Sequence, residues 1–212
     1  MKIFNSSIFD RQNNGRVLII LLGVSVTLML SAASDKIISS SFPHRLVVDD
    51  IIFRLFATPR SLIFEYYTDV VLISMIAITV WAWKDDMKQY FPYLAVNACL
   101  FYSTRAIINV LTPLQRPLGD AISHGLLRDI AIQYGMFPSG HVGFAVLLFL
   151  LTKDRIEMNL RNILFVLIAF QALLMVITRG HYSIDVVGGI LLAYFVYKIL
   201  QPYKERLVFY SK

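Results

Sequence analysis

The sequence predicts an all-α, polytopic membrane protein, a single domain over residues 1–212 that forms a bundle of six transmembrane helices. Hydrophobic residues make up 57% of the chain and charged residues only 16%, and the mean hydropathy is +0.64. A soluble domain of this length would expose too much of that apolar surface to water. Long apolar runs recur along the chain, and each crossing of a hydrocarbon core about 30 Å thick takes roughly 20 such residues.

Six apolar runs are expected to cross the membrane as helices. In chain order they cover residues 17–33, 64–83, 92–112, 139–151, 161–178 and 183–200. The fourth run is short and is expected to borrow residues from its flanks. The first run, with basic residues before it and small residues after it, also fits a secretory signal, but five further spans favour a retained anchor.

The connection between the first two spans, residues 34–63, contains one segment with a pattern of its own. Residues 49–56 combine charged and apolar side chains in a way that fits a short amphipathic helix lying at the membrane interface. A plain connecting segment fits the same residues equally well.

The positive charges predict how the bundle is oriented. If six spans alternate, twelve of the 20 Lys and Arg residues fall on one side of the membrane, seven fall on the other, and Arg105 lies within a span. Loops rich in Lys and Arg stay in the cytoplasm. Both termini are therefore expected there, and the loops after the first, third and fifth spans are expected on the outer face.

The net charge of +6 does not predict nucleic-acid binding, because the chain has no dense basic tract and its positive residues alternate with apolar spans. The single cysteine, Cys99, lies inside an apolar run, which excludes an intramolecular disulfide. The distribution of charge is typical of membrane topology.

The most informative segment joins the fifth and sixth spans and contains His181 and Asp185, four residues apart. On a helix this spacing puts both side chains on one face, where the carboxylate can accept from one imidazole nitrogen and leave the other free to attack. His181 is expected at a helix start, where free amide groups and the helix dipole favour an anion. Arg179, two residues earlier, offers a planar fork suited to phosphate oxygens.

A second motif, Pro138-Ser139-Gly140-His141, stands immediately before the fourth span. Proline can start a helix, serine can cap it or donate to an oxyanion, and glycine lets the backbone approach a ligand closely. A lone histidine at a membrane edge is more often an interfacial side chain with no chemistry. Two such histidines favour a catalytic site, because six alternating spans place the starts of the fourth and the sixth helix at the same outer face.

Arg105 is expected roughly 10 Å from the outer end of the third span, at 1.5 Å of rise per residue. An arginine at that depth is costly unless it faces a partner or a polar cavity. It is expected to bind phosphate near the two histidines, and pairing with an internal carboxylate is the alternative.

At these residues the chain resembles the type-2 phosphatidic acid phosphatase superfamily, over residues 102–189 and in the six-span layout. The matching residues are Arg116-Pro117, Pro138-Ser139-Gly140-His141, and His181 with Asp185. Two positions depart from the superfamily pattern. Asn109 stands where it has lysine, and Thr178-Arg179 stands one residue from His181 instead of five.

These departures point to the sphingomyelin-synthase-like branch of that superfamily. In the first pattern of this branch, a tyrosine is followed after two residues by an arginine and after six more residues by a threonine. Tyr102, Arg105 and Thr112 match this pattern. In the second pattern, His-Tyr-Ser/Thr is separated by one residue from Asp-Val. The chain matches this pattern from His181 onward. The branch usually has Cys-Gly-Asp shortly before its Ser-Gly-His serine, and this chain has Gln133-Tyr134-Gly135 there.

The resemblance implies a lipid phosphotransferase or phosphatase with a histidine nucleophile, without a cofactor or metal, whose partners are membrane lipids. It implies that His181 attacks phosphorus, that Asp185 orients it, and that His141 protonates the departing oxygen. The residues implied to hold the phosphate are Arg105, Arg116, Ser139, Gly140 and Arg179. A lipid hydroxyl as acceptor makes a transferase, the favoured outcome, and water makes a phosphatase of a lipid phosphate or polyprenyl diphosphate.

Two other classes of protein stay open. One is a non-enzymatic relative or lipid carrier that keeps the fold, and the other is a zinc site made by the two histidines and the aspartate, although the spacing contains no separate zinc signature. Weaker candidates for contact with the substrate are Tyr102, Tyr182, Asp120 and His124. For the last two, a solvated charged loop is the commoner explanation.

Overall fold

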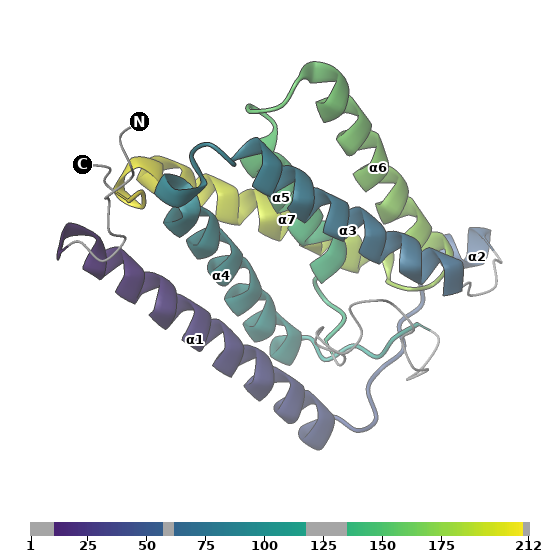
Figure 1. Ribbon diagram of the computed structural model, residues 1–212. Coiled ribbons are helices and arrows are strands. Elements are labelled where there is room, and N and C mark those ends of the chain that lie inside the picture. Colours follow the sequence, from purple (N-terminus) through teal and green to yellow (C-terminus); the bar gives the residue numbers. More distant parts are fainter. Residues whose placement is uncertain (1–10, 57–61, 118–134, 210–212) are drawn as a thin grey trace.

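The computed structural model describes residues 11–56, 62–117 and 135–209, and within these ranges it contains helices and no strand (Figure 1). The elements are α1 (Arg11–Ser41), α2 (Ile51–Leu55), α3 (Leu62–Ala82), α4 (Met87–Leu111), α5 (Gly140–Thr152), α6 (Met158–Ile177), α7 (Ser183–Leu200) and the 3₁₀-helix η1 (Gln201–Arg206). The all-α prediction is confirmed for this part of the chain.

Each of the six predicted spans coincides with a helix, and the bounds predicted for α7 are those observed. α1 extends beyond the predicted 17–33 at both ends, because polar residues continue the helix past its apolar stretch. Near its C-terminus, for example, the hydroxyl of Ser40 donates to the carbonyl oxygen of Lys36 at 2.7 Å. α4 begins at Met87 and runs through Pro92, which was predicted to start it. Prolines are tolerated inside membrane helices when neighbouring groups satisfy the backbone.

Residues 49–56 fitted a short amphipathic helix and a plain connecting segment equally well, and within them Ile51–Leu55 form the short helix α2. Asp50 caps this helix, since its side chain accepts from the backbone N–H of Ile52 at 2.9 Å. α2 packs against α6, so it is held by the protein itself.

Four helices in the described ranges are long and apolar enough to cross a membrane, and this makes the chain a membrane protein. They cover Asn13–Ser41, Met87–Leu111, Met158–Ile177 and Ser183–Arg206. The described apolar parts of α3 and α5, Tyr66–Ala82 and Gly140–Thr152, are shorter. The expected total of six spans is therefore not established by helix length and composition.

α5 is short because the chain before it is folded irregularly inside the bundle. Gly135, Met136, Pro138 and Ser139 are all buried in this non-helical segment. Irregular backbone at membrane depth is tolerated only where protein covers it or where it lines a cavity. The 13 residues of α5 rise about 20 Å at 1.5 Å per residue, less than a full crossing.

α5 lies at the centre of the bundle, packed against α3, α4, α6 and α7. α1 packs along α4 on one side, and α6 packs against α3 on the other (Figure 1). The start of α1 and η1 lie at one end of the bundle, and α2 lies at the opposite end (Figure 1). The loop before α5 and the turn before α7 thus begin their helices at the α2 end.

Two glycines let α5 and α7 approach closely at that end. A Cβ atom at Gly143 would lie 2.8 Å from the carbonyl oxygen of Gly189, and a Cβ atom at Gly189 would lie 2.6 Å from the carbonyl oxygen of Ser139. Both distances are shorter than any side chain accepts, and both contacts are with backbone. Gly143 and Gly189 therefore determine how closely α5 and α7 approach each other.

Gly189→Ala is expected to destabilise the protein by about 1–3 kcal/mol, because the added methyl must push the backbone of α5 away. The measurement is the thermal unfolding temperature of the purified protein in detergent, which should fall. Gly23→Ala on α1 is the control, since its Cβ would meet only the side chain of Cys99, at 3.5 Å. Equal melting temperatures for Gly189→Ala and the natural protein would contradict this account of the helix crossing.

Candidate active site

His181 and Asp185 form a buried pair where the turn after α6 leads into α7. Nδ1 of His181 lies 3.2 Å from Oδ2 of Asp185, and the same oxygen accepts from the backbone N–H of Tyr182 at 3.0 Å. The predicted pairing is therefore present, although His181 lies two residues before α7 and not in its first turn. The turn itself is fixed by Met175, whose carbonyl oxygen accepts from the backbone N–H groups of Gly180 and His181.

Burial controls the protonation of this pair. His181 is 8% exposed and Asp185 is fully buried. Burial lowers the pKa of His181 below the ordinary value of 6.5, and the hydrogen bond and negative charge of Asp185 oppose this only in part. A neutral imidazole that donates Nδ1–H to the carboxylate keeps a lone pair on Nε2, the state that a nucleophile needs.

A second histidine–carboxylate pair was not predicted from the sequence. Nε2 of His141, in the first turn of α5, lies 2.8 Å from Oδ1 of Asp69 on α3. The side chain of Asp69 is only 4% exposed. The available signal was that Asp69 is one of two carboxylates, with Glu65, in the predicted span 64–83, since such residues are rare in membranes and usually face partners.

The two pairs belong to one region of the protein. The backbone N–H of Ser139 donates to the carbonyl oxygen of Asp185 at 2.9 Å, which ties the loop before α5 to the first turn of α7. The positive charges of His141 and Arg105 also lower the pKa of His181, an effect that requires all three side chains to be near one another. The prediction that both histidines start helices at the same end of the bundle agrees with this geometry.

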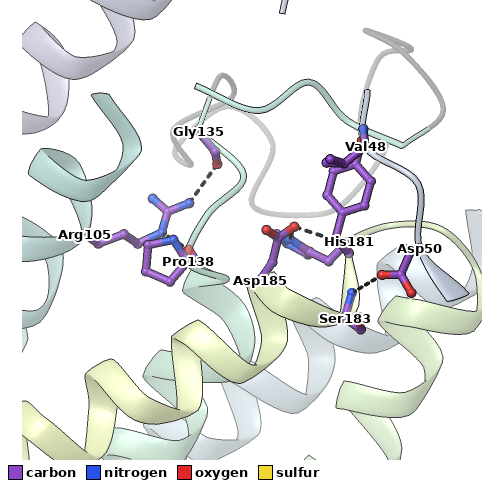
Figure 2. A network of polar contacts seen from close by, with 9 residues as sticks. Val48, Asp50, Arg105, Gly135, Pro138, His181, Ser183 and Asp185 are labelled. Atoms are coloured by element: carbon purple, nitrogen blue, oxygen red, sulfur yellow. Dashed lines mark hydrogen bonds and ion pairs between the residues drawn. The ribbon is translucent and has the colours of Figure 1, made fainter. Parts of the chain in front are cut away.

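Arg105 was expected to bind phosphate, and the structure gives it contacts within the protein. Its Nε donates to the carbonyl oxygen of Pro138 at 2.9 Å and its Nη2 to that of Gly135 at 3.0 Å (Figure 2). The guanidinium therefore braces the loop that precedes α5. Gly140 lies against it, because a Cβ there would be 3.0 Å from Nε of Arg105.

Two polar side chains in this region are fully buried and lack a hydrogen-bond partner among the described residues. They are Ser139, through its hydroxyl, and Asn109, through both atoms of its amide. Ser139 stands at the N-cap position of α5 but its side chain makes no capping hydrogen bond. Asn109 lies directly against the loop, since a Cβ at Gly135 would be 2.2 Å from its Nδ2.

The segment around α2 is docked onto the start of α7. Asp50 accepts from the backbone N–H of Ser183 at 2.6 Å (Figure 2). The hydroxyl of Tyr182 accepts from the backbone N–H of Val48 at 3.2 Å. Burial acts to raise the pKa of Asp50, but hydrogen bonds from the N–H groups of Ser183 and Ile52 outweigh it, so this pKa is below its ordinary value. A carboxylate of the chain, Asp50, thus accepts from the first N–H group of α7, where the sequence indicated a site for a phosphate.

The other predicted residues are distributed around this region. Arg179 has a positive φ of 58° and donates from Nη2 to the carbonyl oxygen of Phe53 at 3.1 Å, so it holds α2. Tyr102 packs its ring on that of Phe144, with centroids 5.0 Å apart. Arg116 is half-buried in the loop after α4. Asp120 and His124 lie outside the described residues.

Comparisons with known proteins show the family of the chain. A family model described as AtPDCT1/2 matches residues 57–201, well over half of the chain, and this range contains both histidine–carboxylate pairs. A curated relative is phosphatidylcholine:diacylglycerol cholinephosphotransferase 2 of Arabidopsis thaliana, 28% identical over 102 residues. The alignment covers 47% of this chain and 33% of the relative, so the chain matches only about a third of that protein's length. No solved structure matches the chain.

Proposed function

Because the chain belongs to the AtPDCT1/2 family, we propose that it is a membrane enzyme that exchanges phosphocholine between phosphatidylcholine and diacylglycerol. The observation that carries this proposal is the presence of two histidine–carboxylate contacts, the buried His181–Asp185 and the part-buried His141–Asp69, beside a buried loop. Head-group transfer between lipids needs a nucleophile and a proton carrier in a water-poor site, and the two pairs supply both. The substrates in this proposal are those in the name of the Arabidopsis relative, phosphatidylcholine and diacylglycerol.

We further propose that the chain is a distant member of the type-2 phosphatidic acid phosphatase superfamily, in its sphingomyelin-synthase-like branch. The support is the Pro138-Ser139-Gly140-His141 motif and the His181–Asp185 spacing. On this view α3 and α5 complete a set of six spans, both termini are cytoplasmic, and the site opens to the outer leaflet.

In the first half-reaction, Nε2 of His181 attacks the phosphorus of the donor lipid. The new P–N bond forms as the P–O bond to diacylglycerol breaks, and His141 gives its proton to the departing oxygen. Asp185 stabilises the imidazolium that forms on His181, and Asp69 holds the ring of His141. The hydroxyl of Ser139 and the N–H groups near Gly140 would bind the phosphoryl oxygens, together with Arg105, Arg116 and Arg179.

In the second half-reaction a different diacylglycerol takes the place of the first. His141 removes the proton from its hydroxyl, the oxygen attacks phosphorus, and the P–N bond to His181 breaks. The donor's diacylglycerol has then been exchanged for another under an unchanged head group. Water in place of diacylglycerol would turn the same residues into a phosphatase.

The test is an exchange assay with the purified full-length protein in detergent–lipid micelles. Phosphatidylcholine with isotope-labelled acyl chains is mixed with unlabelled diacylglycerol, and the proposal expects labelled diacylglycerol together with unlabelled phosphatidylcholine. Parallel reactions contain ceramide as acceptor, or phosphatidic acid or a polyprenyl diphosphate as substrate. Release of phosphate or phosphocholine into water without a new phospholipid would overturn transfer in favour of hydrolysis.

The pH dependence of exchange follows from the burial of His181. Protonated His181 cannot attack, so kcat/KM should rise with pH through the pKa of this residue. Because burial lowers this pKa, the acid limb is expected below pH 6.5. Asp185 opposes that shift, so Asp185→Asn should move the limb to still lower pH. An acid limb above pH 6.5 would contradict the role assigned to His181.

Asp69→Asn is expected to lower kcat about 10- to 100-fold, less than the 10²–10⁴-fold that a general acid–base group itself contributes. The amide keeps the size of the side chain but no longer stabilises a positively charged His141. Asp86→Asn is the matched control, because Asp86 pairs with Arg155 at 2.8 Å and belongs to neither histidine–carboxylate pair. Equal activities of both variants would remove Asp69 from the mechanism.

A further inference from the structure

A pocket of about 540 Å³ adjoins the candidate site at the α2 end of the bundle. Its volume is within the roughly 300–1,000 Å³ typical of small-molecule sites. Three segments far apart in the sequence line it: the chain after α1, the chain after α4, and the residues that flank the catalytic motifs. The residues used below are His44, Arg45, Leu46, Leu114, Phe137 and Ile184.

The walls of this pocket are built into the fold. The backbone N–H of Gln115 donates to the carbonyl oxygen of Leu46 at 3.1 Å, which joins the chain after α4 to the chain after α1. The ring of Phe137 packs on α7, since a Cβ at Gly188 would be 2.5 Å from Cε2 of that ring. The pocket is therefore held by contacts with the same helix that carries Asp185.

The pocket is connected both to the site and to the apolar surface. Phe137 stands two residues before Ser139, and Ile184 stands directly before Asp185. Ile184 is 54% exposed and Leu46 is 77% exposed, so apolar side chains continue from the pocket onto the outside of the molecule. In a membrane protein such a surface faces lipid, and a hydrocarbon chain can enter from the bilayer without crossing water.

The polar members of the lining indicate which lipid fits. His44 and Arg45 are basic, and no acidic residue lines the pocket within the described ranges. Basic side chains beside an apolar pocket complement a lipid that carries a phosphate. Diacylglycerol carries none, whereas the donor phospholipid does.

We propose that this pocket binds one acyl chain of the donor phospholipid and thereby places its phosphate between His141 and His181. The proposal rests on the proposed function, because it assigns the pocket to a substrate of that reaction. It adds a chain-binding site to the head-group chemistry, and it makes the enzyme sensitive to donor chain length.

Leu114→Trp tests the proposal by filling the pocket. The quantity measured is the ratio of kcat/KM for dioleoyl-phosphatidylcholine to kcat/KM for dihexanoyl-phosphatidylcholine, with one fixed diacylglycerol acceptor. Each buried methylene is worth a factor of about four in binding, so the ratio is expected to fall about tenfold or more. Leu191→Trp is the matched control, because Leu191 is 62% exposed on α7 and does not line the pocket. An unchanged ratio in Leu114→Trp would overturn the proposal.

A second measurement does not depend on catalysis. Full-length protein with His181→Ala is illuminated in vesicles with phosphatidylcholine that carries a diazirine at the end of one acyl chain, and labelled residues are identified by mass spectrometry. Labelling concentrated at residues 42–46, 112–114 and Phe137 supports the proposal even if the natural protein exchanges no head group, in which case only the proposed function fails. Labelling spread evenly over exposed apolar residues, or seen in the pocket only with a diazirine-bearing diacylglycerol, would overturn it.

Discussion

His181→Ala is expected to reduce head-group exchange by about 10⁴- to 10⁶-fold, the loss seen when a covalent nucleophile is removed from an enzyme whose catalytic groups act together. Without the imidazole no P–N bond can form, and Asp185 loses the hydrogen bond that it accepts from Nδ1–H. The measurement is the single-turnover rate with labelled phosphatidylcholine. Free imidazole should restore part of the activity by entering the space left by the ring.

A control on folding accompanies this variant. His181→Gln keeps a side chain of similar length with a group able to donate to Asp185, so it should melt like the natural protein and remain inactive. Full exchange activity in a well-folded His181→Ala protein would reject covalent catalysis and favour a lipid carrier.

Asp185→Asn is expected to lower kcat by about 10⁴-fold, as in other enzymes whose orienting carboxylate is replaced by an amide. The amide can still accept from the backbone N–H of Tyr182, so the turn before α7 should be kept. The atom that accepts from Tyr182 is also the one that faces Nδ1 of His181, so the amide oxygen keeps both contacts, but without a negative charge it no longer stabilises the imidazolium. The effect is measured as kcat at the pH of maximal activity.

Asp49→Asn is the matched control for Asp185→Asn. Asp49 is an exposed carboxylate that pairs with Arg54 near α2, outside the histidine pairs. Its loss should leave kcat within about twofold, since exposed ion pairs contribute little. A comparable loss in both variants would mean that charge near α2, and not orientation of His181, is responsible.

The helices were predictable from the sequence because their apolar runs are long. α7 was predicted with its observed bounds, since Ser183 follows a turn and the apolar run ends near Leu200. Whether α5 is long enough to span the membrane could not be predicted, because hydropathy does not distinguish an apolar helix that crosses the membrane from one that begins inside the bundle. Burial of the segment 135–139 depends on contacts with α4 and α7 that only the folded chain contains.

The candidate site was predictable where it is local in sequence. The four-residue spacing of His181 and Asp185 implied their contact, and that contact is present. Asp69 was missed because 72 residues separate it from His141. The directions of Arg105 and Arg179 were also beyond sequence analysis, since backbone carbonyl oxygens of other segments accept from both guanidinium groups.

Trapping the phosphorylated enzyme tests the central claim most directly. The natural protein is mixed with phosphatidylcholine labelled in its phosphocholine group, without added diacylglycerol, then quenched in alkali and cleaved after arginine and lysine, which isolates His181 on the peptide that follows Arg179. We expect an acid-labile phosphocholine adduct on His181 that disappears when diacylglycerol is added. Rapid exchange with no adduct on His181, or with the adduct on another residue, would contradict the account.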